Sequence, residues 1–232
     1  LAADGDHGYL YAAEGGCVKK YRLSDSVLLG IISQHSGAWS MSISCTQSIG
    51  DGHFNGAQGI AIDNDNGFIY VSDSGSSKIS KFNATSGAFI GSLGRSTATT
   101  GTCPVGAAAP GWCTGGTFAS GAGTGMFNFP RSVAVDPVGN ALFVADSLNY
   151  RIQKFALDTG AFVGTIGRTN ATTGTCPAAG AAPGWCTGGT PTFGTADGML
   201  INLNQIAVDK PNNALYVPDN HRVQKFNLTT GA

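Results

Sequence analysis

Short apolar segments recur along the chain at a fixed spacing, and each copy predicts a set of β-strands. Three copies align over their cores, at residues 59–82, 132–155 and 205–226. Within a copy, apolar and polar residues alternate over a few positions, which is the two-residue period of a strand with one buried face. A degenerate fourth copy occupies residues 10–21. This spacing indicates a repeat protein built from small β-sheets.

Each copy also carries the residues that turns between antiparallel strands require. Asp73, Asp146 and Asp219 end the second strand of successive copies and lie 73 residues apart. Asn and Gly between the first two strands supply the positive φ of tight hairpins. A fourth strand is expected at GAFIGSLG and GAFVGTIG. Since four antiparallel strands per repeat form a propeller blade, the predicted fold is all-β: a β-propeller of about four blades. Its ring is either incomplete or open, which we favour, or closed by a shared strand.

The segment from Val133 to Phe155, VAVDPVGNALFVADSLNYRIQKF, closely resembles an NHL repeat. The positions that match the family's pattern are Asp136, Gly139, Asn140, Val144, Asp146, Asn149, Arg151, Ile152, Gln153 and Phe155. The resemblance implies NHL-like four-stranded blades. Other copies match with losses, because Lys78 replaces the arginine and Pro218 interrupts a strand. The repeated Asp and Arg suggest either a ring of charge around a pore or a structural role. In the structural role, which we favour, the Asp accepts backbone N–H bonds and the Arg packs its stem over the next blade.

The chain is predicted to be one NHL-like propeller region, residues 1–232, interrupted by two inserts. The segments are blade 1 at about 1–33, blade 2 at about 55–94, an insert at 95–126, blade 3 at about 127–167, an insert at 168–199 and blade 4 at about 200–232. We expect the nearly identical inserts to be loops that project from one face. Trp112 and Trp185 precede the second cysteine of each insert. Each Trp either packs on its own disulfide or is presented to a partner or a sugar.

The number and spacing of the cysteines favour disulfides. The six are Cys17, Cys45, Cys103, Cys113, Cys176 and Cys186. The last four form two matching pairs, which favours Cys103–Cys113 and Cys176–Cys186 and leaves Cys17–Cys45 as the third bridge. Zinc is the alternative, but neither insert contains a histidine and the cysteine spacing is wide. Disulfides predict an oxidising compartment, and so an extracellular or cell-surface location.

The charge and polarity of the chain limit the classes of partner that it is expected to bind. The net charge is −1 and charged residues make up 12% of the sequence, against roughly 25% in typical domains. No segment is densely basic, so nucleic acid is not expected as a partner. No apolar run approaches the roughly 18–20 residues of a membrane span, so membrane insertion is not expected. Three sequons make Asn83, Asn170 and Asn227 candidate N-glycosylation sites.

The sequence predicts no catalytic residues, no cofactor and no metal site. NHL-like propellers include amidating lyases and related metal-dependent lyases and lactonases, and the resemblance implies metal ligands around the central channel for such an activity. The histidines here, His7, His35, His53 and His221, share no blade position, and Glu14 is the single glutamate. A metal site needs several convergent ligands. A metal-dependent lyase or lactonase is therefore the least favoured function, and the chain is expected not to be an enzyme.

Low charge, 35 glycines, paired cysteines and near-duplicate repeats favour a non-catalytic extracellular protein with a structural or adhesive role. Its partner would be protein, by self-association through sheet edges or insert loops, or glycan. The chain would then be a subunit of a surface fibre or filament, or a fragment of a longer repeat protein. The alternative is a ligand- or glycan-binding propeller domain of a sensor or receptor.

Overall fold

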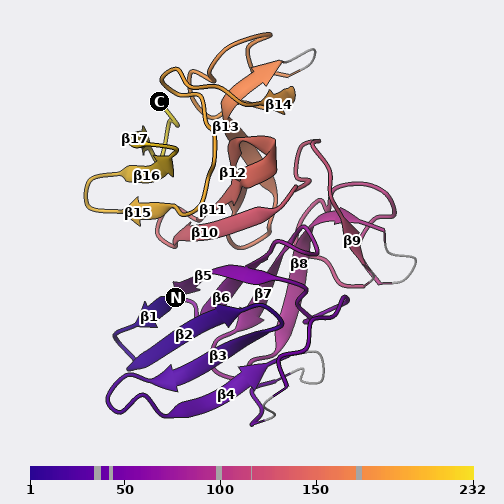
Figure 1. The fold of residues 1–232 in the computed structure, drawn as a ribbon, viewed down its shortest axis with the longest axis vertical. Helices are drawn as coiled ribbons and strands as arrows, with labels where there is room; N and C mark the ends of the chain where they lie inside the picture. Colours follow the sequence, from indigo (N-terminus) through magenta and orange to yellow (C-terminus); the bar gives the residue numbers. More distant parts are fainter. Residues whose placement is uncertain (34–37, 42–43, 98–100, 116, 171–173) are drawn as a thin grey trace.

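The computed structural model describes residues 1–33, 38–41, 44–97, 101–115, 117–170 and 174–232. Within these residues the chain forms four antiparallel sheets, and in each sheet the strands lie side by side in sequence order. The four sheets are the blades of a propeller whose ring is not closed (Figure 1). The predicted all-β fold, a propeller of four blades, is confirmed, and its ring is open.

Each blade is a meander of short strands. Blade 1 contains β1 (Ala2–Asp4), β2 (Tyr9–Glu14), β3 (Cys17–Arg22) and β4 (Leu28–Ile32). Blade 2 contains β5 (Ala57–Asp63), β6 (Phe68–Asp73), β7 (Lys78–Asn83), β8 (Phe89–Ser96) and β9 (Phe118–Ala119). Blade 3 contains β10 (Pro130–Asp136), β11 (Ala141–Asp146), β12 (Arg151–Ala156), β13 (Phe162–Asn170) and β14 (Thr190–Thr192), with a 3-10 turn, η1 (Ser147–Asn149), after β11. Blade 4 contains β15 (Ala207–Asp209), β16 (Ala214–Asp219) and β17 (Arg222–Asn227).

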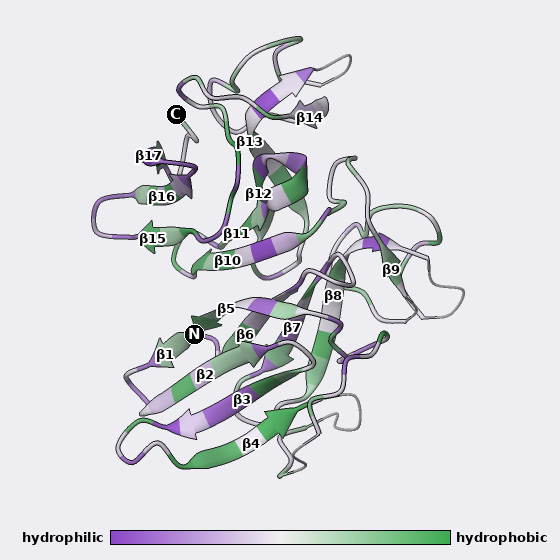
Figure 2. Ribbon diagram, in the orientation of Figure 1, coloured by the Kyte–Doolittle hydropathy of each residue, from purple (hydrophilic) through white to green (hydrophobic). Residues whose placement is uncertain are grey.

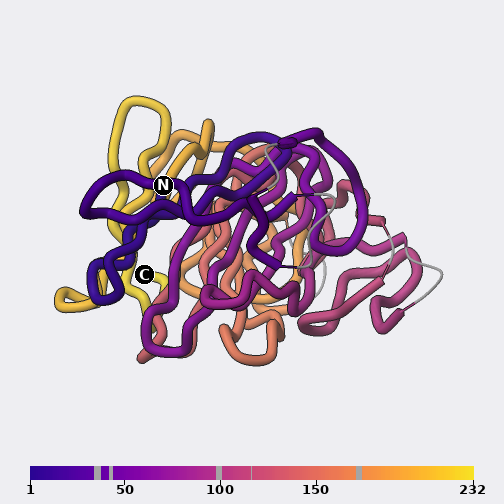
Figure 3. The backbone as a smooth tube through the Cα atoms, turned by 90° about the horizontal axis from the view of Figure 1, so that it is seen from below, coloured from indigo at the N-terminus to yellow at the C-terminus, as the bar shows by residue number. Residues whose placement is uncertain are grey.

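The first strands of the blades lie next to one another around the propeller axis. Strand β5 contacts β1 on one side and β10 on the other, and β10 also contacts β15. Blades 1 and 2 form the lower half of the molecule in Figure 1, and blades 3 and 4 the upper half. The two ends of the chain lie on the same side of the ring in this view and in the perpendicular one (Figure 3). The first and last blades therefore border the gap in the ring.

The hairpins between the first and second strands use the turn chemistry that the sequence predicts. Gly67, Asn140 and Asn213 occupy equivalent positions and all have positive φ, at 70°, 49° and 50°. The preceding aspartate closes the turn: Asp136 accepts the backbone N–H of Gly139 at 3.0 Å. These side chains fix the length of each hairpin and so the register of its strands.

The blades pack face to face through apolar clusters. Between blades 2 and 3, Tyr70, Ile79 and Leu93 pack against Val144 and Phe155. Equivalent clusters fill the spaces between blades 1 and 2 and between blades 3 and 4. Figure 2 shows that apolar residues concentrate in strands such as β4 and β16, while the turn between β15 and β16 is hydrophilic. Blades 2 and 3 therefore each bury two apolar faces, one against each neighbour.

The two inserts fold back onto their own blades instead of projecting as free loops. Strand β9 pairs with β8, and β14 pairs with β13, so blades 2 and 3 have five strands. Blade 4 has three strands among the described residues. The described part of the chain contains no helix that is long and apolar enough to span a membrane.

Candidate functional site

The repeated aspartates are buried inside the blades and do not line a pore. Asp73, Asp146 and Asp219 are at most 1% exposed. The Asp146 carboxylate accepts the backbone N–H of Asn128 at 2.7 Å, which fixes the segment that leads into β10. The equivalent donors in blades 2 and 4 are the backbone N–H groups of Asn55 and Ile201. The aspartates accept backbone N–H bonds, as the structural interpretation predicted, mainly from the entry segment of the blade. Asp73 also accepts one from Ser76 in the turn after its strand, at 3.2 Å.

The arginine of the repeat stays within its own blade. Arg151 Nε donates to Asp146 at 2.8 Å, and Nη2 donates to the carbonyls of Gly123 and Met126 at 2.8 Å each. The prediction that this cation packs over the next blade was wrong, because the buried carboxylate holds the guanidinium beside it. Burial raises the pKa of Asp146, and the charge of Arg151 opposes that rise.

A lysine and a tryptophan of one blade instead reach across to the next. Between blades 2 and 3, Lys81 Nζ lies 3.4 Å and Trp112 Nε1 lies 3.1 Å from the carbonyl oxygen of Leu157, and both donate to it. We call the interface between two neighbouring blades a seam. In the seam between blades 1 and 2 the equivalent donors are Lys20 and Trp39, and the acceptor is the carbonyl of Ala84. In the seam between blades 3 and 4 the donors are Lys154 and Trp185, and the acceptor is the carbonyl of Leu228. We call this pair of bonds the latch. The blade face that bears the lysine is the donor face, and the face that bears the carbonyl is the acceptor face.

The latch lysine also lies among aromatic rings. Lys81 Nζ is 5.4 Å from the centroid of the Trp112 ring and 5.5 Å from that of Tyr70. Burial lowers the pKa of Lys20, Lys81 and Lys154 alike. The carbonyl and the ring faces offset part of the cost of burying the ammonium group. The same arrangement recurs in all three seams, so it is a regular structural element of the repeat.

The structure places the two predicted partner-binding tryptophans in the seams. Trp112 and Trp185 are half-buried, and each ring lies 5.6 Å, centroid to centroid, from an aromatic ring of its own blade, Tyr70 and Phe143. Trp39 has the same role in the first seam. Sequence reasoning missed Trp39 because it lies outside the duplicated inserts, where no matching copy signals its position.

All three disulfides favoured by the sequence are formed. They are Cys17–Cys45, Cys103–Cys113 and Cys176–Cys186, and the described residues include no free cysteine. Cys113 and Cys186 form isolated bridges with Ser92 and Thr165 in the fourth strands of their blades. The disulfides therefore fasten each insert next to its tryptophan.

The candidate glycosylation sites differ in their surroundings. Asn83 and Asn227 are the last residues of the third strands of blades 2 and 4, and their side-chain oxygens accept backbone N–H bonds from Ser86 and Thr230. Asn170 ends β13 and is exposed, but the threonine of its sequon lies outside the described residues. The amide nitrogens of Asn83 and Asn227 remain candidates for modification.

Lys78 takes the place of the arginine in blade 2. It is fully buried, and its Nζ donates to the carbonyl of Gly50 at 2.6 Å. Burial lowers the pKa of Lys78 to about 8 from its usual 10.5. The folded chain therefore releases this proton well before the unfolded chain does.

We expect the free energy of unfolding to rise between about pH 8 and about pH 9.5. The unfolded chain keeps its lysine protons to about pH 10.4 and so binds more protons than the folded chain, which adds about 2 kcal/mol for Lys78 across this window. The lowered pKa values of Lys20, Lys81 and Lys154 act in the same direction. Urea denaturation at a series of pH values measures the slope, which Lys78→Met should reduce. A flat or falling curve would contradict the prediction.

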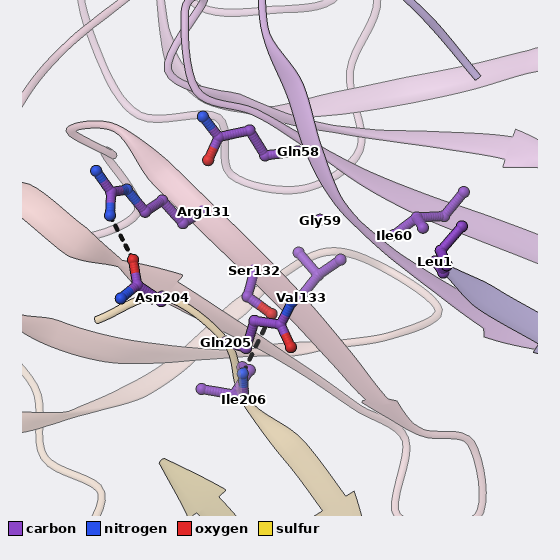
Figure 4. A pocket seen from close by; sticks show the side chains of 10 residues that line it. All are labelled: Leu1, Gln58, Gly59, Ile60, Arg131, Ser132, Val133, Asn204, Gln205 and Ile206. Carbon is purple, nitrogen blue, oxygen red and sulfur yellow. Dashed lines mark hydrogen bonds between the residues drawn. The ribbon is translucent and has the colours of Figure 1, made fainter. Parts of the chain in front are cut away.

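A polar pocket of about 310 Å³ lies at the propeller axis, between β5, β10 and the segment 204–206 that leads into β15 (Figure 4). Gln58, Arg131 and Asn204 occupy the same position in blades 2, 3 and 4, 73 residues apart. Arg131 points toward Asn204 and donates a hydrogen bond from Nη1 to its side-chain oxygen. The pocket lining contains no carboxylate side chain.

The first and last blades each present one apolar face to solvent. On the donor face of blade 4, Val223 is 64% exposed, whereas its equivalents Ile79 and Ile152 are fully buried. Lys225, the latch lysine of this blade, is exposed and makes no hydrogen bond, ion pair or ring contact with the described residues. On the acceptor face of blade 1, Leu23 is 43% exposed. The chain thus exposes one half of a latch at each end of the blade array.

The titratable side chains form no metal centre in the part of the chain that the structure describes, where no group of three or more His, Cys, Asp or Glu could hold an ion. His7 pairs with Asp4 at 3.0 Å, and His53 Nδ1 lies 2.9 Å from the carbonyl of Ile49. His221 lies in the turn between β16 and β17, and His35 falls outside the described residues.

Comparison with known proteins supports the blade assignment. Residues 54–82 and 127–155 match the family model described as NHL repeat. The hydrazine synthase of Kuenenia stuttgartiensis has a similar fold, with a TM-score of 0.53 and 11% identity over 98% of this chain, and this chain spans 45% of the synthase chain. The glutaminyl cyclase of Myxococcus xanthus matches with a TM-score of 0.48 and 11% identity over 97% of this chain and 69% of that one. No curated protein matches in sequence.

Proposed function

Because the chain is an open propeller built from NHL repeats, we propose that it is a non-catalytic structural protein of the extracellular space or cell surface. It associates head to tail with further copies of itself, through the donor face of blade 4 and the acceptor face of blade 1. The observation that carries this proposal is the latch, which occurs in all three internal seams, while its lysine is exposed on blade 4 and the residue at its acceptor position, Leu23, is exposed on blade 1.

The exposed faces are chemically complementary. Tyr216 and Lys225 are directly paired across β16 and β17, as Tyr70 and Lys81 are across β6 and β7. The acceptor face of blade 1 offers Leu10, Tyr21 and Leu23 at the positions of Ile69, Phe82 and Ala84 in blade 2. A second copy therefore meets blade 4 with the same apolar groups and the same carbonyl that blades 2, 3 and 4 offer to their neighbours. Such a contact joins two different surfaces, so repetition gives a closed ring or a filament.

The contact proposed here uses blade faces, whereas the sequence suggested sheet edges. In blades 2 and 3 the outer strands β8 and β13 are already paired with β9 and β14, which leaves less edge to recruit another chain. The three disulfides support the extracellular location, since such bonds persist in oxidising compartments.

A ligand- or glycan-binding propeller domain is the second candidate. The axis pocket favours it, because it gathers polar groups from three blades. The insert tryptophans support it less, since their indole N–H groups donate to carbonyls within the seams.

Sedimentation velocity over a range of protein concentrations tests the association. The wild-type chain is expected to form species larger than a monomer, and Lys225→Glu should weaken this association at least about tenfold by replacing a charged donor. Arg95→Glu makes the same charge change on β8 beside the insert and should have no effect. A chain that stays monomeric, or an association that Lys225→Glu leaves unchanged, would overturn the proposal.

Mixing two variants shows whether the contact is head to tail. Lys225→Glu damages the donor face, Leu23→Asp damages the acceptor face, and each variant keeps the other face intact. Each variant alone should be monomeric, whereas an equimolar mixture should form a one-to-one dimer and nothing larger. Failure of the mixture to dimerise would rule out this pairing of faces.

A further inference from the structure

We propose that the axis pocket binds the carboxylate of a small polyhydroxylated acid, of the size and chemistry of a uronic acid, with Arg131 as its anchor. Nothing in the head-to-tail contact requires this site, because the pocket is formed by the first strands and the segments that precede them, whereas the latch groups lie on the third strands and in the loops.

Arg131 has no ion pair within the described residues, and its guanidinium lies over the Phe129 ring, 5.2 Å from the ring centroid. Arg151 and Arg222 form ion pairs with Asp146 and Asp219, whereas Arg131 forms none. The residues that line the pocket with it are neutral: amides, a serine, a glycine and aliphatic side chains. A cation in a partly enclosed neutral pocket attracts an anion, since its field is weakly screened there.

The geometry of the guanidinium selects a carboxylate. Nη1 is occupied by Asn204, while Nε is buried and has no hydrogen-bond partner. Nε and Nη2 form the remaining edge of the planar group, and two parallel N–H donors on one edge match the two oxygens of a carboxylate. A buried donor without a partner costs free energy, which a bound oxygen recovers. The bond to Asn204 and the contact with the Phe129 ring therefore hold the Arg131 side chain in the orientation that a carboxylate requires.

The rest of the lining suits hydroxyl groups. Gln58 and Gln205 contribute amides that both donate and accept hydrogen bonds, and Ile60, Val133 and Ile206 supply apolar contact. A pocket of about 310 Å³ is at the small end of ligand sites and accommodates one sugar-sized molecule. The predicted ligand thus has one carboxylate and several hydroxyls on a compact ring.

Isothermal titration calorimetry with sodium glucuronate tests the site, with glucose as the uncharged probe of the same size. Saturable binding of glucuronate is expected, at least about tenfold tighter than that of glucose, because glucose lacks the carboxylate that pairs with the Arg131 guanidinium. A uronic acid could come as a free acid or as the end of a polysaccharide, and a diglucuronide distinguishes the two. Tighter binding of the diglucuronide indicates a polysaccharide end, and weaker binding a free acid.

Arg131→Gln keeps a polar side chain and should weaken glucuronate binding at least tenfold. Arg168→Gln is the matched control, because Arg168 also has a buried Nε without a partner but lies on β13, outside the pocket. It should bind as the wild type does, as should Lys225→Glu, which separates this site from self-association. Thermal unfolding checks that each variant is folded. Absent binding, equal binding of glucose, or full binding by Arg131→Gln would overturn the proposal.

Discussion

Arg151→Ala is expected to lower the free energy of unfolding by about 3–5 kcal/mol, because it leaves a buried carboxylate without its charge partner. The Arg151 side chain is 2% exposed and that of Asp146 is fully buried, with Nε and Oδ2 2.8 Å apart. The variant also removes the two bonds from Nη2 to the carbonyls of Gly123 and Met126. Urea denaturation at neutral pH, followed by tryptophan fluorescence, measures the loss.

The matched control lies in blade 4, where the aspartate of the same pair is buried but water reaches the arginine. The Arg222 side chain is 32% exposed, and its Nη2 is 3.0 Å from Asp219. Because solvent screens this pair, Arg222→Ala should cost about 1–2 kcal/mol, well below the cost in blade 3. Equal losses for the two variants would show that burial of the pair doesn't set its contribution.

The sequence predicted the blades because their information is local. Strand alternation, the turn residues around Asn140 and the aspartate that ends each second strand lie within one repeat, so period and spacing reveal them. The disulfides were accessible for the same reason, since the duplicated pair Cys103–Cys113 and Cys176–Cys186 lies within each insert.

The seams between blades were not predictable in the same way. Which residue reaches across a seam depends on how one sheet packs on the next. The sequence of a single repeat contains no information about this packing. The long cation was expected to cross at Arg151, but the crossing residue is Lys154, whose Nζ is 2.8 Å from the carbonyl of Leu228. Arg151 does not cross the seam, because its guanidinium pairs with the buried carboxylate of Asp146 in the same blade.

The axis pocket escaped the sequence for a related reason. A charged residue that is identical in the aligned copies suggests a ring of charge around the axis, and the aspartates Asp73, Asp146 and Asp219 have this pattern. The pocket instead uses a position where the copies differ, Gln58, Arg131 and Asn204. Residues that are identical in every copy are those that each blade needs in order to fold. At the axis position the residues differ between copies, so one blade supplies a charged side chain and its neighbours supply amides.

Trp112→Ala is expected to lower the free energy of unfolding by about 3 kcal/mol, since it removes a large ring from the seam between blades 2 and 3. The variant loses the packing of Trp112 against Tyr70 and the bond from Nε1 to the Leu157 carbonyl. It also takes one ring away from the buried ammonium of Lys81, which lies 5.4 Å from the indole centroid. Denaturant unfolding measures the change.

Trp112→Phe separates the two contributions of the indole. It keeps an aromatic ring in the seam but cannot donate to Leu157, and the carbonyl of that residue keeps its bond from Lys81. We expect a cost of about 1 kcal/mol, the net value of one hydrogen bond. If Trp112 served a glycan instead of the seam, Trp112→Ala would leave stability unchanged and abolish sugar binding. If Trp112 serves the seam, Trp112→Ala should lower stability more than Trp112→Phe does. Trp112→Phe should still bind glucuronate, because Trp112 does not line the Arg131 pocket.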